Sequence, residues 1–448
     1  MQRRQILKAI PFFISTWASA TYAQNRPDDA VRLFDLAASK HKRELRDLWK
    51  ARNAPSIRLS DVSSESIARV LKVRSEDSRI DRRGRYGEIT YPDRTALLFY
   101  SYDKENLQVW LVDALGIQAY ESQRISKQHI SEAIIKLRNS LNVDSLQRSR
   151  VPRLRERIKA GTVDDNEGES QDHSINNLTQ ILLPTTVANK LDTVEHLIIV
   201  PILEIGIVPF AILRPFRDNS FLIDRMSISI APSLFDLSQA LHEDNSRGLL
   251  ESPLIVGNPY LPKSTIWSVP PLPGAEKEAQ AVAKMMNAIP LLRKEATKAE
   301  IVSRARTSSL LYFATHGVAS SQNPLSDSFL MLSAERFDQG WWTAQEIQST
   351  RLRARIAILS ACQTGLGKAH DAGIIGLSRA FQIAGVPRVV MSLWSVDDQA
   401  TSQLMQTFIK HLETQFPSEA LRQAMLEVRQ EYSEPSKWAS FVVFGTPR

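Results

Sequence analysis

The sequence has a single cysteine among its 448 residues, Cys362, so no intramolecular disulfide can form. It also has no CxxC pattern, no HExxH pattern and no cluster of histidine, cysteine and carboxylate residues at the spacing of metal ligands. We therefore expect no metal site and no cofactor. An unpaired cysteine is usually a buried, inert residue, and this interpretation holds unless other residues give the thiol a function.

An excess of charge of one sign is also missing. The formal net charge is +7, and the hydrophobic and charged fractions, 43% and 23%, are those of an ordinary soluble globular protein. The chain length predicts two or three domains. Basic residues gather only locally and without interleaved aromatic residues, so we expect no nucleic-acid partner.

The one apolar run near the N-terminus is too short to span a bilayer. MQRRQILK is basic, AIPFFISTWASA is apolar, and the small residues that follow end in ASATYA. This order predicts an export signal at residues 1–23, and a periplasmic or secreted mature chain without a membrane span. Arg3 and Arg4 resemble the pair of a twin-arginine signal, with an ordinary basic start as the alternative. Cleavage is expected after Ala23 or Ala20.

Internal repeats of the kind that build helical arrays are absent. Residues 24–92 are polar and predict an N-terminal helical segment, with Asp61 or Ser63 as the cap of its second helix. The runs TALLFYSY and NLQVWLVD then predict two strands joined as a hairpin around Asp103–Asn106. The next run, ISKQHISEAIIKLRNSLN, has apolar residues at helical spacing.

Residues 146–174 separate charge of opposite sign along the chain. LQRSRVPRLRERIK is basic, and TVDDNEGESQDH is acidic and nearly without large apolar residues. This composition is typical of a solvated, flexible linker. A cleavable activation segment is the second interpretation, because an exposed arginine-rich loop is open to proteolysis.

From Ser252 onward, apolar strands alternate with amphipathic helices. This order predicts an α/β fold with a mostly parallel sheet that is covered by helices on both faces. Ligands of such sheets bind at the carboxyl ends of the strands. Four strands end in residues with chemical functions, which are Asn258, His316 with Gly317, Cys362, and Asp397 with Asp398.

The stretch ILSACQTGLGKAHDAG allows two interpretations, a phosphate-binding loop or a nucleophile at the end of a strand. A P-loop requires the pattern GxxxxGK[ST], in which the first glycine turns the loop and the final hydroxyl binds magnesium. Here Cys362 stands at the first glycine position, and Ala369 follows Lys368. Two required features are missing, so the stretch is not expected to bind phosphate.

Cys362 and His316 favour the second interpretation. If their strands are parallel neighbours, one or two strand spacings of about 5 Å separate the two residues. A thiol beside a base is the arrangement that nucleophilic catalysis requires. The N–H groups of Gly317 and Cys362 are candidates for binding an oxyanion. His370 is the rival base, but we expect it in a loop with no strand to fix it.

A set of short segments occurs together in this chain. They are TALLFYSYDKENLQVWLVD, IVPILEIGIVPFAIL, APSL, VGNP, LPGAEKEA, YFATHG, ILSACQTGLGK, GIIGLSRAF, AGVPRVVMSLWSVDDQAT and SFVVFG. The combination, over roughly residues 93–448, resembles the CHAT-domain family of caspase-like cysteine peptidases, which are related to separase. The resemblance implies a caspase-like α/β sandwich with a His–Cys dyad at His316 and Cys362. It also implies a degenerate pseudo-protease lobe at residues 93–250 that supports a catalytic lobe at 251–448.

Two features depart from the family pattern. The family often follows GLGK with a GGEG-like loop, whereas this chain has HDAG, so Ala372 stands where the acid is common and Asp371 is adjacent. Family members also often carry long helical repeat arrays, which this chain does not have. Recognition of a substrate is therefore expected to use other surfaces.

The sequence thus predicts an exported cysteine endopeptidase that hydrolyses peptide bonds in a protein or peptide substrate. Asp327, Asp397 and Asp398 are candidates for pairing with a basic side chain of the substrate at P1, the residue before the scissile bond. A helix cap at Asp398 or its neighbour is the alternative. An activating protein partner is a further expectation.

A catalytically inactive CHAT-type binding or scaffold module is the alternative function. The altered HDAG loop favours it, as does the vulnerability of an unpaired thiol to oxidation in an exported protein. The presence of His316, Gly317 and Cys362 together favours the enzyme.

Overall fold

The computed structural model describes most of the chain. The described residues are 27–50, 62–76, 94–143, 170–239, 250–261, 271–320, 323, 325–360, 368–370, 373–394 and 398–445. The predicted export signal, the cap at Asp61 and the segment 146–169 lie outside these ranges. Helix α6 (Gln171–Leu182) begins inside the segment that the sequence suggested as a linker.

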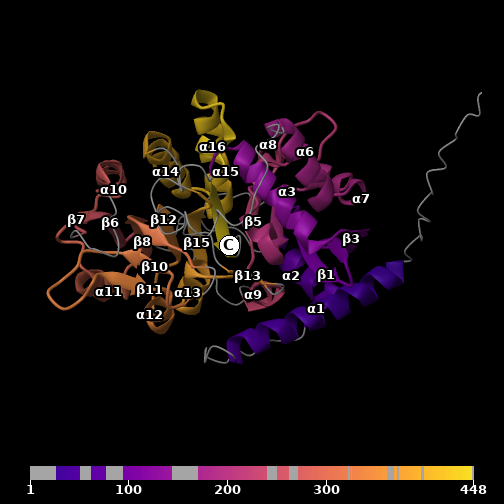
Figure 1. The fold of residues 1–448 in the computed structure, drawn as a ribbon, viewed down its shortest axis with the longest axis horizontal. Coiled ribbons are helices and arrows are strands. Elements are labelled where there is room, and N and C mark those ends of the chain that lie inside the picture. The colour runs from indigo at the N-terminus through magenta and orange to yellow at the C-terminus, as the bar shows by residue number, and fades with distance from the viewer. Residues whose placement is uncertain are drawn as a thin grey trace, which may run out of the picture.

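Within the described part, a sheet of eleven strands runs through the whole molecule (Figure 1), in the order β3-β2-β1-β4-β5-β16-β15-β12-β8-β6-β7. Its strands are β1 (Thr95–Asp103), β2 (Asn106–Asp113), β3 (Gly116–Arg124), β4 (His196–Val200), β5 (Ser227–Ile230), β6 (Pro253–Pro259), β7 (Leu291–Arg293), β8 (Leu310–Ala314), β12 (Ile356–Ser360), β15 (Arg388–Ser392) and β16 (Phe441–Gly445). Smaller sheets contain β9 (Gly317–Val318), β10 (Phe329–Met331) and β11 (Trp341–Thr343), and β13 (Lys368–His370) with β14 (Gly373–Ile375).

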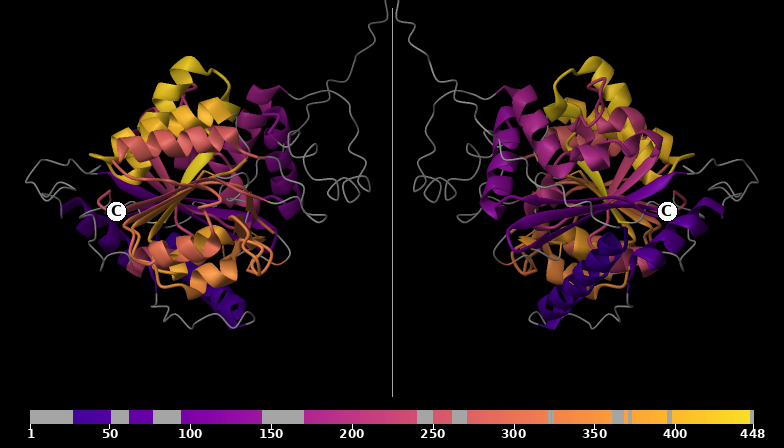
Figure 2. Two further views of the ribbon diagram at one scale, coloured as in Figure 1. Left: turned by 90° about the vertical axis from the view of Figure 1, so that its left-hand side faces the viewer. Right: turned by 90° about the vertical axis from the view of Figure 1, so that its right-hand side faces the viewer.

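Helices cover both faces of the large sheet, which gives three layers (Figure 2). One face carries α3 (Lys127–Ser140), α6, α10 (Pro273–Met285), α14 (Asp398–Leu412) and α15 (Pro417–Glu431). The other carries α1 (Pro27–Lys50), α2 (Ser64–Glu76), α9 (Leu234–Gln239), α11 (Lys298–Ala305), α12 (Ala344–Ser349) and α13 (Leu377–Ile383). Short helices are α7 (Thr185–Ala188), α8 (Leu222–Arg225), α16 (Pro435–Trp438) and the 3-10 turns η1 (Leu191–Thr193), η2 (Leu203–Ile207) and η3 (Phe210–Ile212).

The central strands are apolar along their whole length because helices bury both of their faces. In β8, Leu310, Tyr312 and Ala314 point to the α10 face, while Leu311 and Phe313 point to the α11 face. This two-residue alternation is what a pleated strand requires. No helix within the described ranges has the length and apolar character needed to cross a membrane.

The predicted hairpin at Asp103–Asn106 is confirmed, since Asp103 pairs with Asn106 across the β1–β2 turn. The two predicted helices before it are present as α1 and α2, and Ser63 caps α2 by accepting a 3.1 Å hydrogen bond from the Ser66 N–H. Trp110 of β2 donates to the Ala30 carbonyl of α1 at 3.1 Å. Phe34 packs edge-on against the Trp110 ring, so α1 is held by an aromatic contact.

Strand β16 joins the two halves of the sheet. It is antiparallel to β15 and parallel to β5, where Phe444 faces Ile230. The C-terminal strand of the chain therefore lies in the middle of the sheet, between the strands of residues 94–239 and those of residues 250–394. We call these two sets of residues the N-terminal half and the C-terminal half.

The run GIIGLSRAFQIAG contains two elements. Gly373–Ile375 is strand β14, and helix α13 begins at Leu377. Strand β14 pairs with β13 as an antiparallel ribbon, so its backbone hydrogen bonds go to the neighbouring strand instead of along a helix.

Gly445 ends β16 with φ at +117°, and a Cβ there would collide with the carbonyl oxygen of Pro387. Gly116 has the same kind of backbone, with φ at +115°, but nothing lies within 4 Å of a Cβ built on it. Both Gly445→Ala and Gly116→Ala introduce the strain of a left-handed residue, and only the first adds a collision with backbone. We expect Gly445→Ala to be less stable than Gly116→Ala by about 2 kcal/mol.

Chemical unfolding followed by circular dichroism measures this difference. Gly116→Ala is the matched control, because it reports the backbone strain alone. Equal losses of stability in the two variants would contradict the close approach of β16 to the start of β15.

Candidate active site

The strand that leads to His316 and the strand that leads to Cys362 are direct neighbours. Strands β8 and β12 are parallel, and their register places Ala314 beside Ser360. Strand β15 lies on the other side of β12, and β6 on the other side of β8, all parallel. The four strands are therefore parallel neighbours, which is the condition on which the predicted pairing of His316 with Cys362 depended. Their carboxyl ends form one edge, which we call the reactive edge.

His316 lies at this edge, two residues after the end of β8, and is half-buried. A small sheet fixes its backbone. The His316 carbonyl accepts a 2.9 Å hydrogen bond from the N–H of Met331 in β10. The neighbouring Thr315 hydroxyl donates to the Met331 carbonyl at 2.5 Å. The small sheet thus fixes the backbone of His316 just beyond the end of β8.

Gly317 begins β9, the edge strand of the small sheet, and pairs with Leu330 of β10. In an antiparallel pair, residues exchange backbone hydrogen bonds only at every second position. Since Met331 donates to His316, the Gly317–Leu330 position is a non-bonded one. The N–H of Gly317 therefore points away from β10.

Cys362 and Asp397, together with Asp371 and Ala372 of the HDAG loop, lie outside the described residues. The roles predicted for Cys362 and Asp397 stay predictions. The described chain reaches Ser360 before Cys362, and resumes at Asp398 after Asp397.

Asp327 and Asp398 belong to different faces of the large sheet. Asp327 is exposed in the turn before β10, and its carboxylate accepts hydrogen bonds from Asn323 at 2.9 Å and Ser326 at 2.8 Å. The hydrogen bond from Asn323 has the largest effect on the pKa of Asp327, and together with the bond from Ser326 it lowers this pKa. Asp398 is the exposed first residue of α14, and its carboxylate packs against Gly274 at the start of α10.

The rival base, His370, is not in an irregular loop as the sequence suggested. It is the last residue of β13 and pairs with Gly373 of β14. The ribbon of β13 and β14 lies beside η2 of the N-terminal half. The expectation that no strand fixes His370 is therefore wrong, because the pairing of the ribbon is a contact that apolar periodicity does not reveal.

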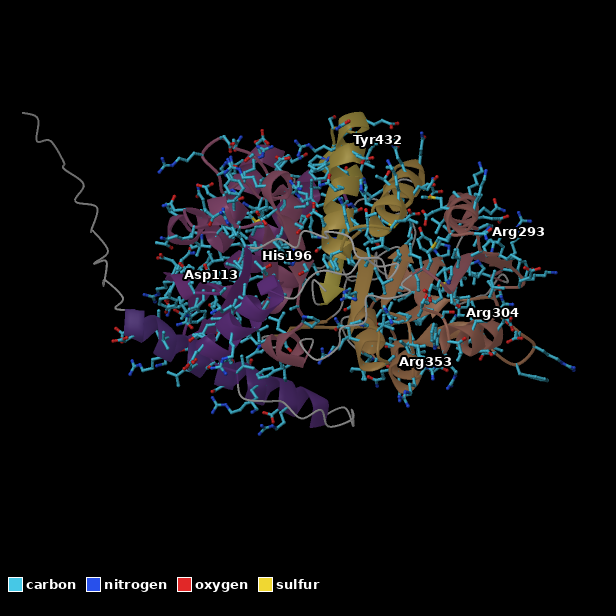
Figure 3. All side chains as sticks on the ribbon, turned by 180° about the vertical axis from the view of Figure 1, so that it is seen from behind. Asp113, His196, Arg293, Arg304, Arg353 and Tyr432 are labelled. Carbon is cyan, nitrogen blue, oxygen red and sulfur yellow. The ribbon has the colours of Figure 1, made fainter. Side chains whose placement is uncertain are left out.

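The N-terminal half also reaches the end of β15. Arg138 of α3 is buried, its Nη2 donates to the Leu393 carbonyl at 3.3 Å, and its guanidinium lies 5.9 Å from the centre of the Trp394 ring. Another histidine, His196, begins β4 in the N-terminal half (Figure 3). Its ring nitrogens bond to Ser227 at 2.8 Å and Ser229 at 3.0 Å, so it is a buried structural residue.

A buried carboxyl lies below the reactive edge and was missed by sequence analysis. Glu278 of α10 is only 3% exposed, and it accepts a 2.7 Å hydrogen bond from the Tyr312 hydroxyl of β8. The hydroxyl of Ser360 in β12 bonds to the same carboxyl. The signal in the sequence was the segment LPGAEKEA, which places an acid on the apolar face of an otherwise amphipathic helix.

No group of three or more histidine, cysteine or carboxylate residues is placed to hold a metal ion in the part of the chain that the structure describes.

A comparison with protein families gives the class to which this architecture belongs. The family model described as the CHAT domain matches residues 172–446, which is more than half of the chain. The chain therefore belongs to the CHAT-domain family.

Two curated relatives are similar over part of the chain. Tetratricopeptide repeat protein 28 of Homo sapiens is 27% identical over 290 residues, which cover 54% of this chain and 12% of the relative. The Mus musculus protein of the same name is 26% identical over the same share of each chain. The match thus spans about an eighth of the length of these relatives.

Among solved structures, the Saccharomyces cerevisiae separase–securin complex is similar with a TM-score of 0.52 and 11% sequence identity. The similarity covers 93% of this chain and 34% of that chain. At this identity the likeness concerns the fold. The prediction of a caspase-like α/β fold with a large, mostly parallel sheet is confirmed.

Proposed function

We propose that this CHAT-domain protein is a cysteine endopeptidase with Cys362 as nucleophile and His316 as general base and acid. The observation that carries the proposal is the register of β8 and β12. Ala314 faces Ser360, His316 follows Ala314 by two residues, and Cys362 follows Ser360 by two residues. His316 and Cys362 therefore each lie two residues beyond a pair of residues that face one another on adjacent strands.

Chain connectivity supports the same pairing. Two residues of extended chain span at most about 7 Å, and adjacent strands lie about 4.8 Å apart. The thiol and the imidazole are thus tethered to neighbouring points on the reactive edge. This spacing meets the first requirement for a nucleophile and a base that exchange a proton.

The proposed reaction has two steps. The Cys362 thiolate attacks the scissile carbonyl carbon, and a carbon–sulfur bond forms. The His316 imidazolium then gives its proton to the leaving amine as the carbon–nitrogen bond breaks. In the second step His316 takes a proton from water, whose oxygen attacks the acyl-enzyme. The carbon–sulfur bond breaks, the carboxylic acid product leaves, and the thiolate–imidazolium pair is restored.

The oxyanion of each tetrahedral intermediate needs preorganised donors. The N–H of Gly317 is one proposed donor, supported by its direction away from β10. The N–H of Cys362 is the second proposed donor. Because the small sheet fixes the backbone at Gly317, its N–H needs little reorganisation during the reaction.

Substrates are proposed to be proteins or peptides with a basic side chain at P1, recognised by Asp327, Asp397 or Asp398. The exposed carboxylate of Asp398 at the reactive edge supports this preference more directly than Asp327, which is already bonded within its own turn. An activating or inhibiting protein partner is also proposed, because separase, whose fold is similar, is in a complex with securin in its solved structure. The location is proposed as periplasmic or secreted, supported by the pattern of residues 1–23.

A scaffold without activity is the second candidate function. The observation that favours it is the HDAG sequence in place of the GGEG-like loop.

Incubation of the purified protein with a peptide library tests the proposal. We expect new peptide ends that mass spectrometry identifies, with lysine or arginine enriched at P1. Cleavage of the protein itself within residues 148–160 is a second product that the same spectra report. A library that stays intact, also in the presence of extracts of the producing cell, would favour the scaffold.

The same library measures the role of each aspartate. If Asp398 pairs with the P1 side chain, Asp398→Asn reduces cleavage after arginine by about tenfold and leaves cleavage after neutral residues unchanged. Asp327→Asn is the comparison variant: if Asp327 pairs with the P1 side chain instead, this variant shows the selective loss and Asp398→Asn does not. An equal loss for basic and neutral residues would exclude Asp398 from P1 recognition.

A further inference from the structure

Glu278 is held against the sheet by a close approach of helix and strand. Gly257 of β6 has no side chain, and a Cβ there would collide with the Cβ of Ala279 in α10. This contact lets α10 lie directly on β6 and β8. Glu278, the residue before Ala279, is consequently buried over the strands and not at the helix surface.

The carboxyl of Glu278 connects the two strands that form the proposed dyad. Tyr312 of β8 bonds to it at 2.7 Å, and Ser360 of β12 bonds to it as well. Burial raises the pKa of Glu278 from its usual value to about 7, against the opposing effect of the two hydroxyl bonds. The group therefore changes its charge close to neutral pH, which a surface carboxyl does not do.

Few charged or titratable groups that the structure describes affect the pKa of Glu278. The nearby carboxylate of Asp398 in α14 raises its pKa further, and Tyr312 is the titratable group of β8. Strand β6 provides the neutral Asn258, which donates at 2.8 Å to Glu276 on a different side of α10. Glu276 also accepts from Arg293 of β7 at 2.9 Å, and Arg293 lies at the far edge of the sheet (Figure 3). None of the charge partners that the structure describes for Glu278 is a cation.

The position of Glu278 points to the proposed active site. Tyr312, Ala314 and, by the alternation of the strand, His316 share one face of the sheet, and Ile358 and Ser360 lie on the same face. Ser360 stands beside Ala314, so its hydroxyl is about two residues of strand, roughly 7 Å, below His316. The carboxyl bonded to Ser360 is thus within electrostatic range of the imidazole.

We propose that Glu278 is a positioning residue for the reactive edge, which ties β8 to β12 through Tyr312 and Ser360 and stabilises protonated His316 when its carboxyl is ionised. This inference rests on the proposed function of His316. A negative charge at roughly 10 Å raises the pKa of an imidazole by about half a unit to one unit at the effective dielectric of a protein. The effect acts only above neutral pH, because below it Glu278 is protonated and carries no charge.

The pH dependence of cysteine alkylation tests this coupling without requiring peptidase activity. Since the chain has one cysteine, the uptake of iodoacetamide by the intact protein reports Cys362 alone. The rate profile has a lower inflection for formation of the thiolate–imidazolium pair and an upper one for loss of the imidazolium proton. We expect Glu278→Gln to move the upper inflection to lower pH by about half a unit to one unit and to leave the lower one in place.

The matched control is Glu276→Gln, which removes a carboxylate from the same helix but leaves both inflections unchanged. Tyr312→Phe is a second variant, which removes the hydrogen bond from Tyr312 to Glu278 and so raises the pKa of Glu278. It should also move the upper inflection to lower pH, but by a smaller amount than Glu278→Gln. Upper inflections that coincide in wild type and Glu278→Gln would overturn the inference, as would a shift of both inflections together.

Thermal unfolding gives a readout that is independent of both thiol and substrate. The folded protein holds the Glu278 proton more tightly than the unfolded chain, so stability falls as the pH rises through the interval between about 4.5 and 7. The melting temperature of the wild type should therefore drop relative to Glu278→Gln over this interval. Parallel curves would show that the carboxyl is not a buried acid. If this drop and the alkylation shift occur while no peptide is cleaved, the inference holds and the peptidase proposal fails.

Discussion

Replacing Cys362 by alanine should lower the rate of peptide-bond hydrolysis by at least about 10⁴-fold. The thiolate is the nucleophile that attacks the peptide bond in the proposed mechanism, and its removal leaves only the catalysis that binding and the oxyanion donors supply. The change removes one sulfur atom and adds no volume. Since the register of β8 and β12 is fixed by backbone pairing upstream, at Ala314 and Ser360, we expect the fold to be kept.

The measurement is the hydrolysis rate of a peptide found by the library, for wild type and Cys362→Ala at equal concentration. A melting temperature within about two degrees of the wild type shows that the variant is folded. Cys362→Ser is the matched variant, because it replaces the thiol by a hydroxyl of similar size whose pKa is far higher than that of a thiol. Cleavage by Cys362→Ala at a tenth of the wild-type rate or more would exclude this thiol as the nucleophile.

Replacing His316 by alanine should lower kcat by about 10²–10⁴-fold, with a much smaller change in KM. The imidazole holds the proton that the thiol gives up and later delivers it to the leaving amine, so its loss affects the chemical step. The backbone of His316 is bonded to Met331, and this contact does not need the side chain. The strand end should therefore keep its place in the variant.

Steady-state kinetics with the same peptide separates the two parameters. His411→Gln is the matched control, because His411 lies on α14 and bonds to Glu427 of α15 at 2.6 Å, away from β8. This variant should keep the wild-type kcat. A loss in His316→Ala that appears only in KM would assign the residue to substrate binding instead of proton transfer.

Local signals in the sequence predicted much of the fold. The β1–β2 turn at Lys104 and Glu105, the Ser63 cap and the strands β8 and β12 follow from apolar periodicity and turn chemistry. The parallel direction of β8 and β12 also followed, because alternating strands and helices build parallel sheets. Whether one or two strand spacings separate the two strands was left open, and their direct pairing is a finding of the structure.

Features that depend on distant residues were not predictable in this way. The position of β16 between β5 and β15 is set by pairings such as Phe444 with Ile230, which no local pattern encodes. The pairing of β13 with β14 was not predicted, because two strands of three residues are too short to show a periodic apolar pattern. The role of Glu278 could not be predicted from the sequence, because it depends on hydrogen bonds from Tyr312 of β8 and Ser360 of β12, which are distant in the chain.

The N-terminal half has a structural role at the reactive edge. Arg138 bonds to the carbonyl that follows β15, and η2 lies beside the ribbon that follows the Cys362 strand. A partner bound to the N-terminal half would thus act on two segments that border the proposed site. This arrangement agrees with a peptidase whose activity a protein partner controls.

The most direct test of the account is the reaction of the protein with a peptidyl chloromethyl ketone that ends in arginine, followed by intact mass spectrometry. The account predicts one adduct, located at Cys362, that forms at least about 100-fold faster in the wild type than in His316→Ala at pH 7. Equal rates of modification in the two proteins would contradict it, because Cys362 would then be an ordinary thiol that His316 does not activate.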